Sequence, residues 1–282
     1  MSYYSTNRTG AVRGDEGGAA SLSNSHICTH GVEANIQFWQ DGSVIRVKRG
    51  SHTTTEHKGG GKRGAVTGFS AGSRRRLTFK LNTLKRGQLP IFVTLTFPEN
   101  YPDVQEAKRL CRALLRKLRK EFPHIGLFWK LEPQTRGAPH FHLLIWNYSE
   151  YILRRFIPKI WYEIAGQGDE NHLLFHLGCL PRSQHCVQQV RSWNGVMYYV
   201  AKYFSKEIVE NWDNPGRFWG CSGKEYLPWA DILEFPVTEK QATIFFRLFR
   251  RVMHIRAKQW HSLRLYCDAN QWLDKFDRLM AT

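Results

Sequence analysis

Two histidines separated by a single residue are the best candidates for chemistry in this sequence. His140 and His142 lie in the run PHFHLLIW, whose apolar and aromatic residues predict a β-strand. Side chains two positions apart on a strand point to the same face and start roughly 6–7 Å apart. Two imidazoles at that distance can bind one metal ion. The alternative is a pair of polar residues on a solvent-facing strand, with no metal at all.

A carboxylate would complete such a metal site. Glu132 ends the run GLFWKLE, a second predicted strand, and the segment 133–138 contains Gly137 and predicts a hairpin turn. The hairpin would bring Glu132 beside His140, with Gln134 as an alternative or additional ligand. Two nitrogens and one carboxylate leave positions open for water and phosphate oxygens. Such a mixed set suits Mn²⁺ or Mg²⁺ better than a closed structural zinc site.

A second group of reactive side chains lies on a helix predicted over residues 193–207. At about 100° per residue, four side chains share one stripe, opposite an apolar stripe: Tyr199, Lys202, Tyr203 and Lys206. A phenol becomes a good nucleophile when its proton is lost, and nearby ammonium groups favour the phenolate. They also stabilise a pentacovalent phosphorus. The alternative is that these tyrosines flank the core residues and only cover the sheet.

These features occur in a definite order. The run IFVTLTF, a predicted strand with Thr94 and Thr96 on one face, is followed by Glu…His-x-His and then by YVAKYFSK. With the flanking runs FSAGSRRRL, GAPHFHLL and PGRFWG, this order resembles the HUH endonuclease superfamily. Within it, the sequence is similar to two-tyrosine rolling-circle replication initiators of phages and plasmids, such as phage replication-associated and filamentous-phage gene II proteins. The resemblance covers about residues 66–253.

The resemblance implies a metal-dependent reaction on single-stranded origin DNA. In this family two histidines, here His140 and His142, hold a divalent metal with an acidic or amide residue, here Glu132. The metal binds the scissile phosphate and aligns the 3′ oxygen as the leaving group. The products are a 5′-phosphotyrosine and a free 3′-OH, which primes synthesis by a host polymerase. A host helicase is the other expected partner.

The family's nucleophile is a tyrosine of the helical motif. Its place in Tyr-x-x-Lys assigns this role to Tyr199, with Lys202 beside it. Tyr203, on the same stripe, would make the second cut and rejoin the strands at termination. Tyr198 is a third candidate nucleophile.

The predicted elements indicate an α+β fold. Further patterns predict a hairpin over residues 36–47, around Asp41 and Gly42, and a short strand over 186–191. They also predict helices over 72–86, 103–121, 150–164 and 238–255, and a last short helix, with Asp103, Thr238 and Asp268 as helix caps. The resemblance implies a central antiparallel sheet of the HUH, RRM-like type, with the His-x-His strand central, flanking helices and a helical C-terminal extension. We expect a mostly flexible extension over 1–65, the HUH endonuclease domain over 66–210, and an aromatic loop with a helical extension over 211–282.

The charge of the chain indicates a polyanionic ligand. Its 282 residues include 41 Lys and Arg against 24 Asp and Glu, a net charge of +17. Sixteen basic and four acidic residues lie between Ser51 and Lys120, which concentrates +12 of this charge. The many aromatic residues suit single strands, whose bases stack on aromatic rings. The residues expected to contact DNA are Arg74, Arg75, Arg76, Lys80, Arg112, Arg116, Arg136 and Lys206.

Several patterns are missing from the sequence. It contains no G-x-x-x-x-G-K-[ST] phosphate loop, no secretory signal and no apolar run of the ~18 residues that span a bilayer. Six scattered cysteines without a C-x-x-C pair are expected to be reduced thiols, in the cytoplasm of a bacterial host. A loose cluster made up of His176, Cys179, His185 and Cys186 fits no standard zinc spacing.

Two other functions compete with nicking. A non-catalytic single-strand binding module would use the basic helices and aromatic residues, and it would need neither the histidines nor the tyrosines. An HUH-type transposase would share the same site residues. A conjugative relaxase usually has its tyrosine before the histidines, and the opposite order here argues against that class.

Overall fold

The structure is a computed structural model, and it describes residues 34–49, 66, 68–194, 212, 215–253 and 262–280. Its contacts divide the chain into two compact units, one of Met1–Lys58 with Ala230–Thr282 and one of Gly59–Trp229. Each unit contains one antiparallel sheet, so the predicted α+β class is confirmed. The boundaries suggested by the sequence, near residues 65 and 210, divide the chain at other places.

The larger sheet belongs to the unit Gly59–Trp229. Its strands are β3 (Ile91–Leu95), β4 (Gly126–Pro133), β5 (Pro139–Trp146), β6 (Val187–Gln189) and β7 (Trp219–Ser222). Their order is β6-β3-β5-β4-β7, with β5 in the middle and every neighbouring pair antiparallel. The strand with both histidines is therefore central, as the resemblance implied. The predicted β4–β5 hairpin also forms, and its turn uses Gly137 at φ 81°, a conformation that costs glycine little.

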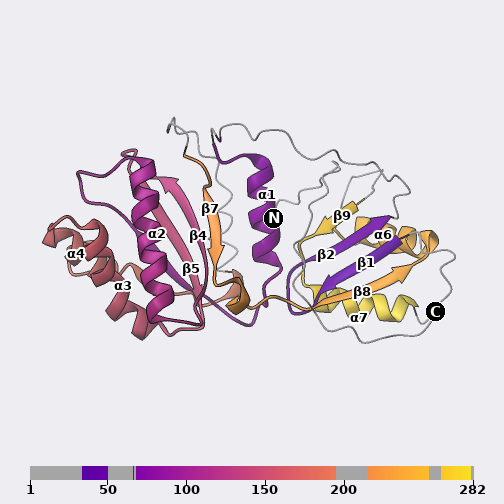
Figure 1. Ribbon diagram of the computed structural model, residues 1–282. Coiled ribbons are helices and arrows are strands. Elements are labelled where there is room, and N and C mark those ends of the chain that lie inside the picture. Colours follow the sequence, from indigo (N-terminus) through magenta and orange to yellow (C-terminus); the bar gives the residue numbers. More distant parts are fainter. Residues whose placement is uncertain are drawn as a thin grey trace. The chain divides into compact units, whose positions relative to one another are not determined.

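Two helices cover one face of this sheet. They are α2 (Val104–Glu121) and α3 (Glu150–Ala165), and they pack on apolar side chains that alternate along the three central strands, including Val93, Leu131 and Leu143. Figure 1 shows α2 on one side of β4 and β5 and helix α1 (Ala71–Asn82) on the other. On the α1 side, Leu77, Leu81 and Leu84 are fully buried, as their predicted common face requires.

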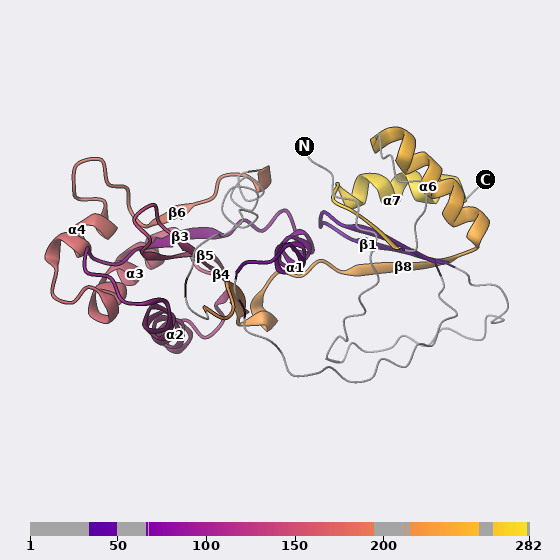
Figure 2. The ribbon, with the colours of Figure 1, turned by 90° about the horizontal axis from the view of Figure 1, so that it is seen from above.

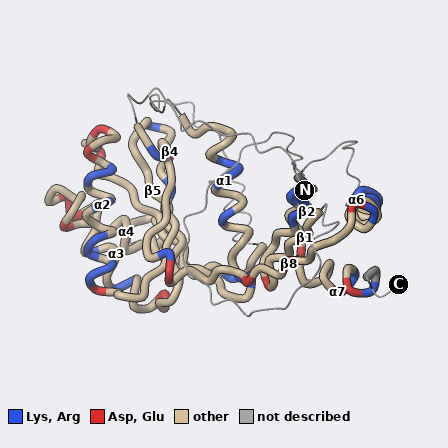
Figure 3. The backbone as a smooth tube through the Cα atoms, turned by 45° about the vertical axis from the view of Figure 1, so that its right-hand side comes forward, with Lys and Arg blue, Asp and Glu red and all other residues tan. Residues whose placement is uncertain are grey.

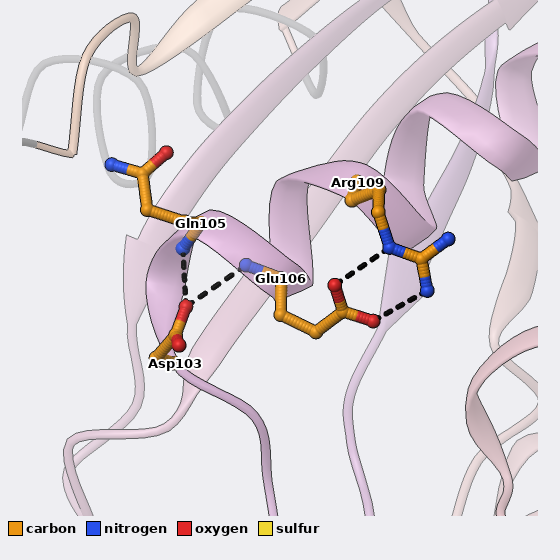
Figure 4. A network of polar contacts seen from close by, with 4 residues as sticks. All are labelled: Asp103, Gln105, Glu106 and Arg109. Atoms are coloured by element: carbon orange, nitrogen blue, oxygen red, sulfur yellow. Dashed lines mark hydrogen bonds and ion pairs between the residues drawn. The ribbon is translucent and has the colours of Figure 1, made fainter.

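Helix α2 begins where the sequence predicts. The carboxylate of Asp103 accepts hydrogen bonds from the backbone N–H groups of Gln105 (2.8 Å) and Glu106 (2.9 Å), which have no partner inside the helix (Figure 4). One turn later Glu106 pairs with Arg109. This cap fixes the first turn, so that Leu114 and Leu118 reach the core while most of the basic residues of α2 remain exposed.

Helix α4 (Glu170–Leu177) was not predicted, because the Gly-rich stretch before it suggested a loop. Asp169 caps its first turn by accepting from the N–H groups of Asn171 and His172. Gly178 ends it at φ 70°, the left-handed conformation usual for glycine after a helix. A helix of eight residues carries too short a pattern to be recognised by periodicity alone.

The smaller sheet belongs to the other unit and has the order β8-β1-β2-β9. Its strands are β1 (Ala34–Trp39), β2 (Ile45–Arg49), β8 (Ile232–Val237) and β9 (Ser262–Leu265). β1 and β2 form the hairpin predicted around Asp41 and Gly42. Helices α6 (Glu239–Met253) and α7 (Ala269–Met280) pack on this sheet through a cluster of apolar and aromatic side chains, and Thr238 and Asp268 cap them as predicted. A short 3₁₀ helix, Lys224–Tyr226, follows β7.

Candidate metal centre

The hairpin brings the predicted metal ligands together. Glu132 on β4 pairs directly with His140 on β5, and one step along the strands His142 lies between Thr94 on β3 and Lys130 on β4. One ligand atom from each of Glu132, His140 and His142 lies within 4.8 Å of the others. Among the described residues, this is the one group of three His, Cys, Asp or Glu side chains that brings its ligand atoms so close.

His142 is held in a fixed orientation. Its Nε2 atom lies 2.7 Å from Oε1 of Glu132, and its Nδ1 atom lies 3.4 Å from Oγ1 of Thr94. The ring also stacks on Phe92, with centroids 5.2 Å apart. The Glu132 carboxylate can only accept, so Nε2 donates to it in this structure. A metal ion bound between the two would replace that proton, while Nδ1 donates to the Thr94 hydroxyl, which is the usual arrangement around a metal-binding histidine.

His140 has the chemistry expected of an unused ligand. Its Nε2 atom is buried and has no hydrogen-bond partner in the protein, although buried polar atoms nearly always have one. Burial, and after it the neighbouring charge of His142, lowers the pKa of His140 to about 3, so the ring is neutral near pH 7 and keeps a lone pair. A neutral nitrogen without a partner, beside a second imidazole and a carboxylate, fits a divalent metal ion.

The sequence did not reveal that a buried lysine touches this centre. The side chain of Lys130 is 0% exposed, and its Nζ atom lies 2.9 Å from Oε2 of Glu132 and 5.3 Å from the centroid of Phe69. Burial alone would raise the pKa of Glu132, but the hydrogen bond and charge of His142, followed by Lys130, lower it overall. Glu132 is therefore ionised at neutral pH. A lysine in the alternating pattern of a strand gave no signal that its ammonium group turns inward.

The larger unit has relatives among known proteins. Residues 90–208 match the family described as replication-associated protein ORF2 and gene II protein, a range that contains β3, the metal hairpin and the predicted tyrosine helix. Over this segment, the chain is similar to the ORF2/gene II family. Two proteins of Xylella fastidiosa, each named as a candidate replication protein, are also similar: the one from strain 9a5c is 29% identical over 63% of this chain, and the one from strain Temecula1 is 27% identical over 57%.

The matches to these relatives are partial. The aligned part of the chain spans 63% and 62% of the lengths of the two Xylella proteins. No solved structure matches the chain. The similarity of residues 90–208, here called the ORF2/gene II segment, thus comes from sequence, and the position of the candidate metal centre within it comes from the strand register described above.

The basic residues expected to contact DNA differ in their exposure and contacts. Five of them are exposed on helices: Arg75, Arg76 and Lys80 on α1, and Arg112 and Arg116 on α2. Figure 3 marks these positive stretches in blue. Arg74 is half-buried and donates from its guanidinium to the carbonyl of Phe69 at 3.2 Å. These five side chains are accessible to solvent, as contact with phosphate requires.

Arg136 makes different contacts. Its guanidinium donates to the carbonyl oxygens of Phe97 (2.7 Å) and Pro98 (3.1 Å), and it lies 5.2 Å from the ring centroid of Tyr101. Its Nε atom donates to Oε1 of Gln134 at 3.0 Å, so the alternative ligand proposed from the sequence is engaged with this arginine. These bonds join the hairpin turn of the ORF2/gene II segment to the chain that leaves β3.

Two histidines of α4 pack against the end of β3. His176 Nδ1 lies 2.8 Å from the carbonyl oxygen of His172, which makes Nδ1 the donor, so Nε2 accepts from the backbone N–H of Thr96 at 3.2 Å. His172 Nε2 donates to the carbonyl oxygen of Thr96 at 2.9 Å. His176 is thus engaged with Thr96, and it forms no metal group with Cys179, His185 and Cys186, all of which the structure describes.

The tyrosine helix lies outside the described residues. This applies to Tyr198, Tyr199, Lys202, Tyr203 and Lys206, whose roles remain predictions from the sequence. None of the helices in the described part of the chain is long and apolar enough to cross a membrane.

Proposed function

We propose that this protein initiates rolling-circle replication by nicking single-stranded origin DNA and later rejoining strands. The observation that carries this proposal is the convergence of Glu132, His140 and His142 inside the segment that matches the ORF2/gene II family. A binding module has no use for a buried, partnerless imidazole beside an ionised carboxylate. A phosphodiester-cleaving enzyme does.

The three ligands define what the centre does. A divalent ion, Mn²⁺ or Mg²⁺, held by Glu132, His140 and His142 would polarise the scissile phosphate. His140 and His142 would each contribute a ring nitrogen, and Glu132 one negative charge. Lys130 adds a positive charge beside Glu132, and this further favours binding of the anionic phosphate at the centre.

Tyr199 is the proposed nucleophile. Its phenolic oxygen forms a bond to phosphorus as the bond between phosphorus and the 3′ oxygen breaks, and the phenolic proton passes to solvent while the leaving oxygen gains one. Lys202 favours the phenolate and stabilises charge on the phosphoryl oxygens. The new bond retains the energy of the phosphodiester, so Tyr203 can make the second cut and rejoining can follow without ATP.

The exposed cations of α1 and α2 supply the binding energy. Arg75, Arg76, Arg112 and Arg116 would neutralise phosphates of the single strand, whose counterions are released on binding. The free 3′-OH would then serve a host polymerase, and a host helicase would separate the strands. Neither DNA synthesis nor DNA unwinding is assigned to this chain.

A covalent adduct tests the proposal. Single-stranded origin DNA labelled on the 3′ side of the cut is incubated with the full chain and Mn²⁺, and a denaturing gel should show labelled protein. Tyr199→Phe should abolish the adduct, whereas Tyr198→Phe, one residue away, should retain it. If Tyr203→Phe alone removes the adduct, the roles of the two tyrosines are exchanged.

A second comparison tests the metal centre. His140→Ala should lose cleavage while retaining single-strand binding, and a chelator should have the same effect on the wild-type protein. Full cleavage in chelator would refute metal assistance. DNA binding without an adduct under any divalent metal would indicate the non-catalytic binding module instead.

A further inference from the structure

The smaller sheet has one face that no described helix of its unit covers. Helices α6 and α7 both lie on the opposite side of the sheet (Figure 2), over the apolar side chains of its strands. Alternation along each strand sends the intervening residues to the uncovered face. Trp39, Ile232 and Pro236 lie on this face. Its other described positions include six polar or charged residues: Asn35 and Gln37 on β1, Arg46 and Lys48 on β2, Glu234 on β8 and Arg264 on β9.

The strand register aligns these residues in rows. One row crosses all four strands as Glu234, Gln37, Arg46 and Arg264, and in the next row Asn35 lies opposite Lys48. With strands about 4.8 Å apart, a row of four spans roughly 14 Å. We call these six side chains the polar sheet face. It holds three basic residues against one acidic residue, and the β2 part of it is marked blue in Figure 3.

The positive charges lie close enough to oppose one another. Burial, and then the charge of Arg264, lowers the pKa of Arg46. Burial, and then the charge of Arg46, lowers the pKa of Lys48. Like charges on adjacent strands cost folding free energy, and a bound polyanion would relieve that cost.

The hydrogen bonds of the polar sheet face do not close on themselves. The carboxylate of Glu234 accepts from the amide nitrogens of Asn35 and Gln37, the latter at 2.7 Å. That leaves Oδ1 of Asn35, Oε1 of Gln37 and Nε of Arg46 buried without a partner in the protein. A purely structural polar network would satisfy all its members, because each unsatisfied group costs stability. A ligand that offers both donors and acceptors would satisfy these groups if their side chains turned outward to meet it.

We propose that the polar sheet face binds double-stranded DNA, with Arg46, Lys48 and Arg264 on phosphates or guanine edges and the amides of Asn35 and Gln37 on adenine edges. Arginine pairs with guanine O6 and N7, and Asn or Gln with adenine N6 and N7, in a major groove about 12 Å wide. Some DNA-binding proteins place a β-sheet in a groove of the duplex and contact the DNA with side chains of its strands. This inference rests on the proposed function, since it adds a second site for the same origin DNA.

The chemistry of the face favours duplex over single-stranded DNA. Single strands bind by stacking their bases on exposed aromatic rings. The one aromatic residue that the described strands place on this face, Trp39, is only 6% exposed. The polar sheet face therefore offers hydrogen bonds and charge but no stacking platform. The metal centre of the larger unit needs an unpaired strand, so the two units would recognise paired and unpaired parts of one origin.

Binding of a random-sequence duplex by variants of the full chain tests this inference. The probe is a labelled duplex of about two helical turns, roughly 20 base pairs, compared with one of its strands alone. The variant is Arg46→Gln with Arg264→Gln, which removes two charges and retains polar side chains. The matched control is Arg247→Gln with Arg251→Gln, the same change at exposed positions of α6. Fluorescence anisotropy over a range of salt concentrations, in chelator, gives the affinities.

The variant Arg46→Gln with Arg264→Gln, here called the sheet variant, should bind the duplex at least about tenfold more weakly. The slope of log K against log salt should fall by about 0.9 for each phosphate that is no longer neutralised, and so by up to about 1.8 for the two arginines. The control should change much less, and single-strand affinity should fall less than duplex affinity. Thermal unfolding should show the sheet variant as stable as the wild type, because it removes mutual repulsion. Lys48→Gln, a milder change, provides a second test with the same expected direction.

Three results would overturn the inference: unchanged duplex affinity in a folded sheet variant, an equal loss in the α6 control, or a loss confined to the single strand. None of these measurements depends on cleavage. A protein that binds duplex through this face but forms no adduct would refute the proposed function alone. A protein that forms the adduct while its sheet variant binds duplex normally would refute the inference alone.

Discussion

The ammonium group of Lys130 lies 2.9 Å from one carboxylate oxygen of Glu132, and the other oxygen lies 2.7 Å from Nε2 of His142. Glu132 is therefore shared between a fully buried cation and a histidine of the candidate metal centre. An isolated lysine in that position would lose its charge or destabilise the fold, since desolvating an ammonium group costs several kcal/mol. The carboxylate that serves the metal centre also makes the buried lysine possible.

This pairing predicts a strong coupling between the two residues. Glu132→Gln should lower the free energy of unfolding by about 3–5 kcal/mol, because it leaves Lys130 buried without a counter-charge. Lys130→Met, which retains the packed stem, should cost less. In the double variant, the loss in the free energy of unfolding should be about 1–3 kcal/mol smaller than the sum of the losses in the two single variants, as measured by urea unfolding. Additive effects would show that the pair contributes no specific interaction.

Metal affinity should depend on the hydroxyl of Thr94. Its Oγ1 lies 3.4 Å from Nδ1 of His142, and loss of such an outer partner typically weakens metal binding about 10–100-fold. Thr94→Val, which retains the shape of the side chain, should therefore weaken Mn²⁺ binding roughly tenfold, as measured from the spin resonance of free Mn²⁺. Thr94→Ser, which restores the hydroxyl, should bind nearly as the wild type does. If Thr94→Val bound Mn²⁺ as tightly as the wild type does, the Thr94 hydroxyl would have no role in metal binding.

Stability should fall in mildly acidic solution because of His176. Burial lowers the pKa of this ring to about 4, whereas an unfolded chain has a histidine pKa of about 6.5. Between these values the unfolded chain binds a proton that the folded chain does not. The free energy of unfolding should therefore decrease as pH falls from about 6.5 to 4, by up to about 3 kcal/mol from this residue, whose contribution is complete below about pH 4. Burial also lowers the pKa of His172, and that of His140 to about 3, so both residues add to the same trend.

Urea unfolding at a series of pH values checks this dependence. His176→Gln, which retains an acceptor for the Thr96 N–H, should flatten the decrease between about pH 6.5 and 4. The exposed His124 offers a matched control, and His124→Gln should leave the slope as in the wild type. An unchanged slope in His176→Gln would show that His176 is not the group responsible.

The sequence predicted those parts of the centre that follow from local periodicity. Strand alternation placed His140 and His142 on one face, and the short turn with Gly137 paired Glu132 with His140, as the register confirms. The capping residues Asp103, Thr238 and Asp268 were likewise visible as single polar residues before helical patterns. Such features depend on neighbours in the chain, so they can be recognised from short windows of sequence.

What the sequence could not predict depends on contacts between distant segments. The burial of Lys130 results from packing beside Phe69, sixty-one positions earlier in the chain. The pairing of β1 with β8 joins residues about two hundred positions apart, and no local pattern specifies it. The role of α4 depends on a bond from His176 to Thr96, across eighty positions. In each case the residue or strand could be recognised in the sequence, but the distant segment that it contacts could not.

Arg136 and Arg75 should separate a structural arginine from a DNA-binding one. Both were expected from the sequence to bind DNA, and both are exposed, but the guanidinium of Arg136 donates to the carbonyl oxygens of Phe97 and Pro98. Arg136→Gln should therefore lower the free energy of unfolding by about 1–3 kcal/mol, since it leaves two carbonyls without their donor, and should leave the salt dependence of single-strand binding unchanged. Arg75→Gln should leave stability unchanged and reduce the slope of log K against log salt by about 0.7, the value for one phosphate neutralised on a single strand.

Urea unfolding and anisotropy titrations with the same oligonucleotide measure both quantities for both variants. If Arg136→Gln reduced the slope as Arg75→Gln does, at unchanged stability, its guanidinium would have to leave the two carbonyls and bind phosphate in the complex.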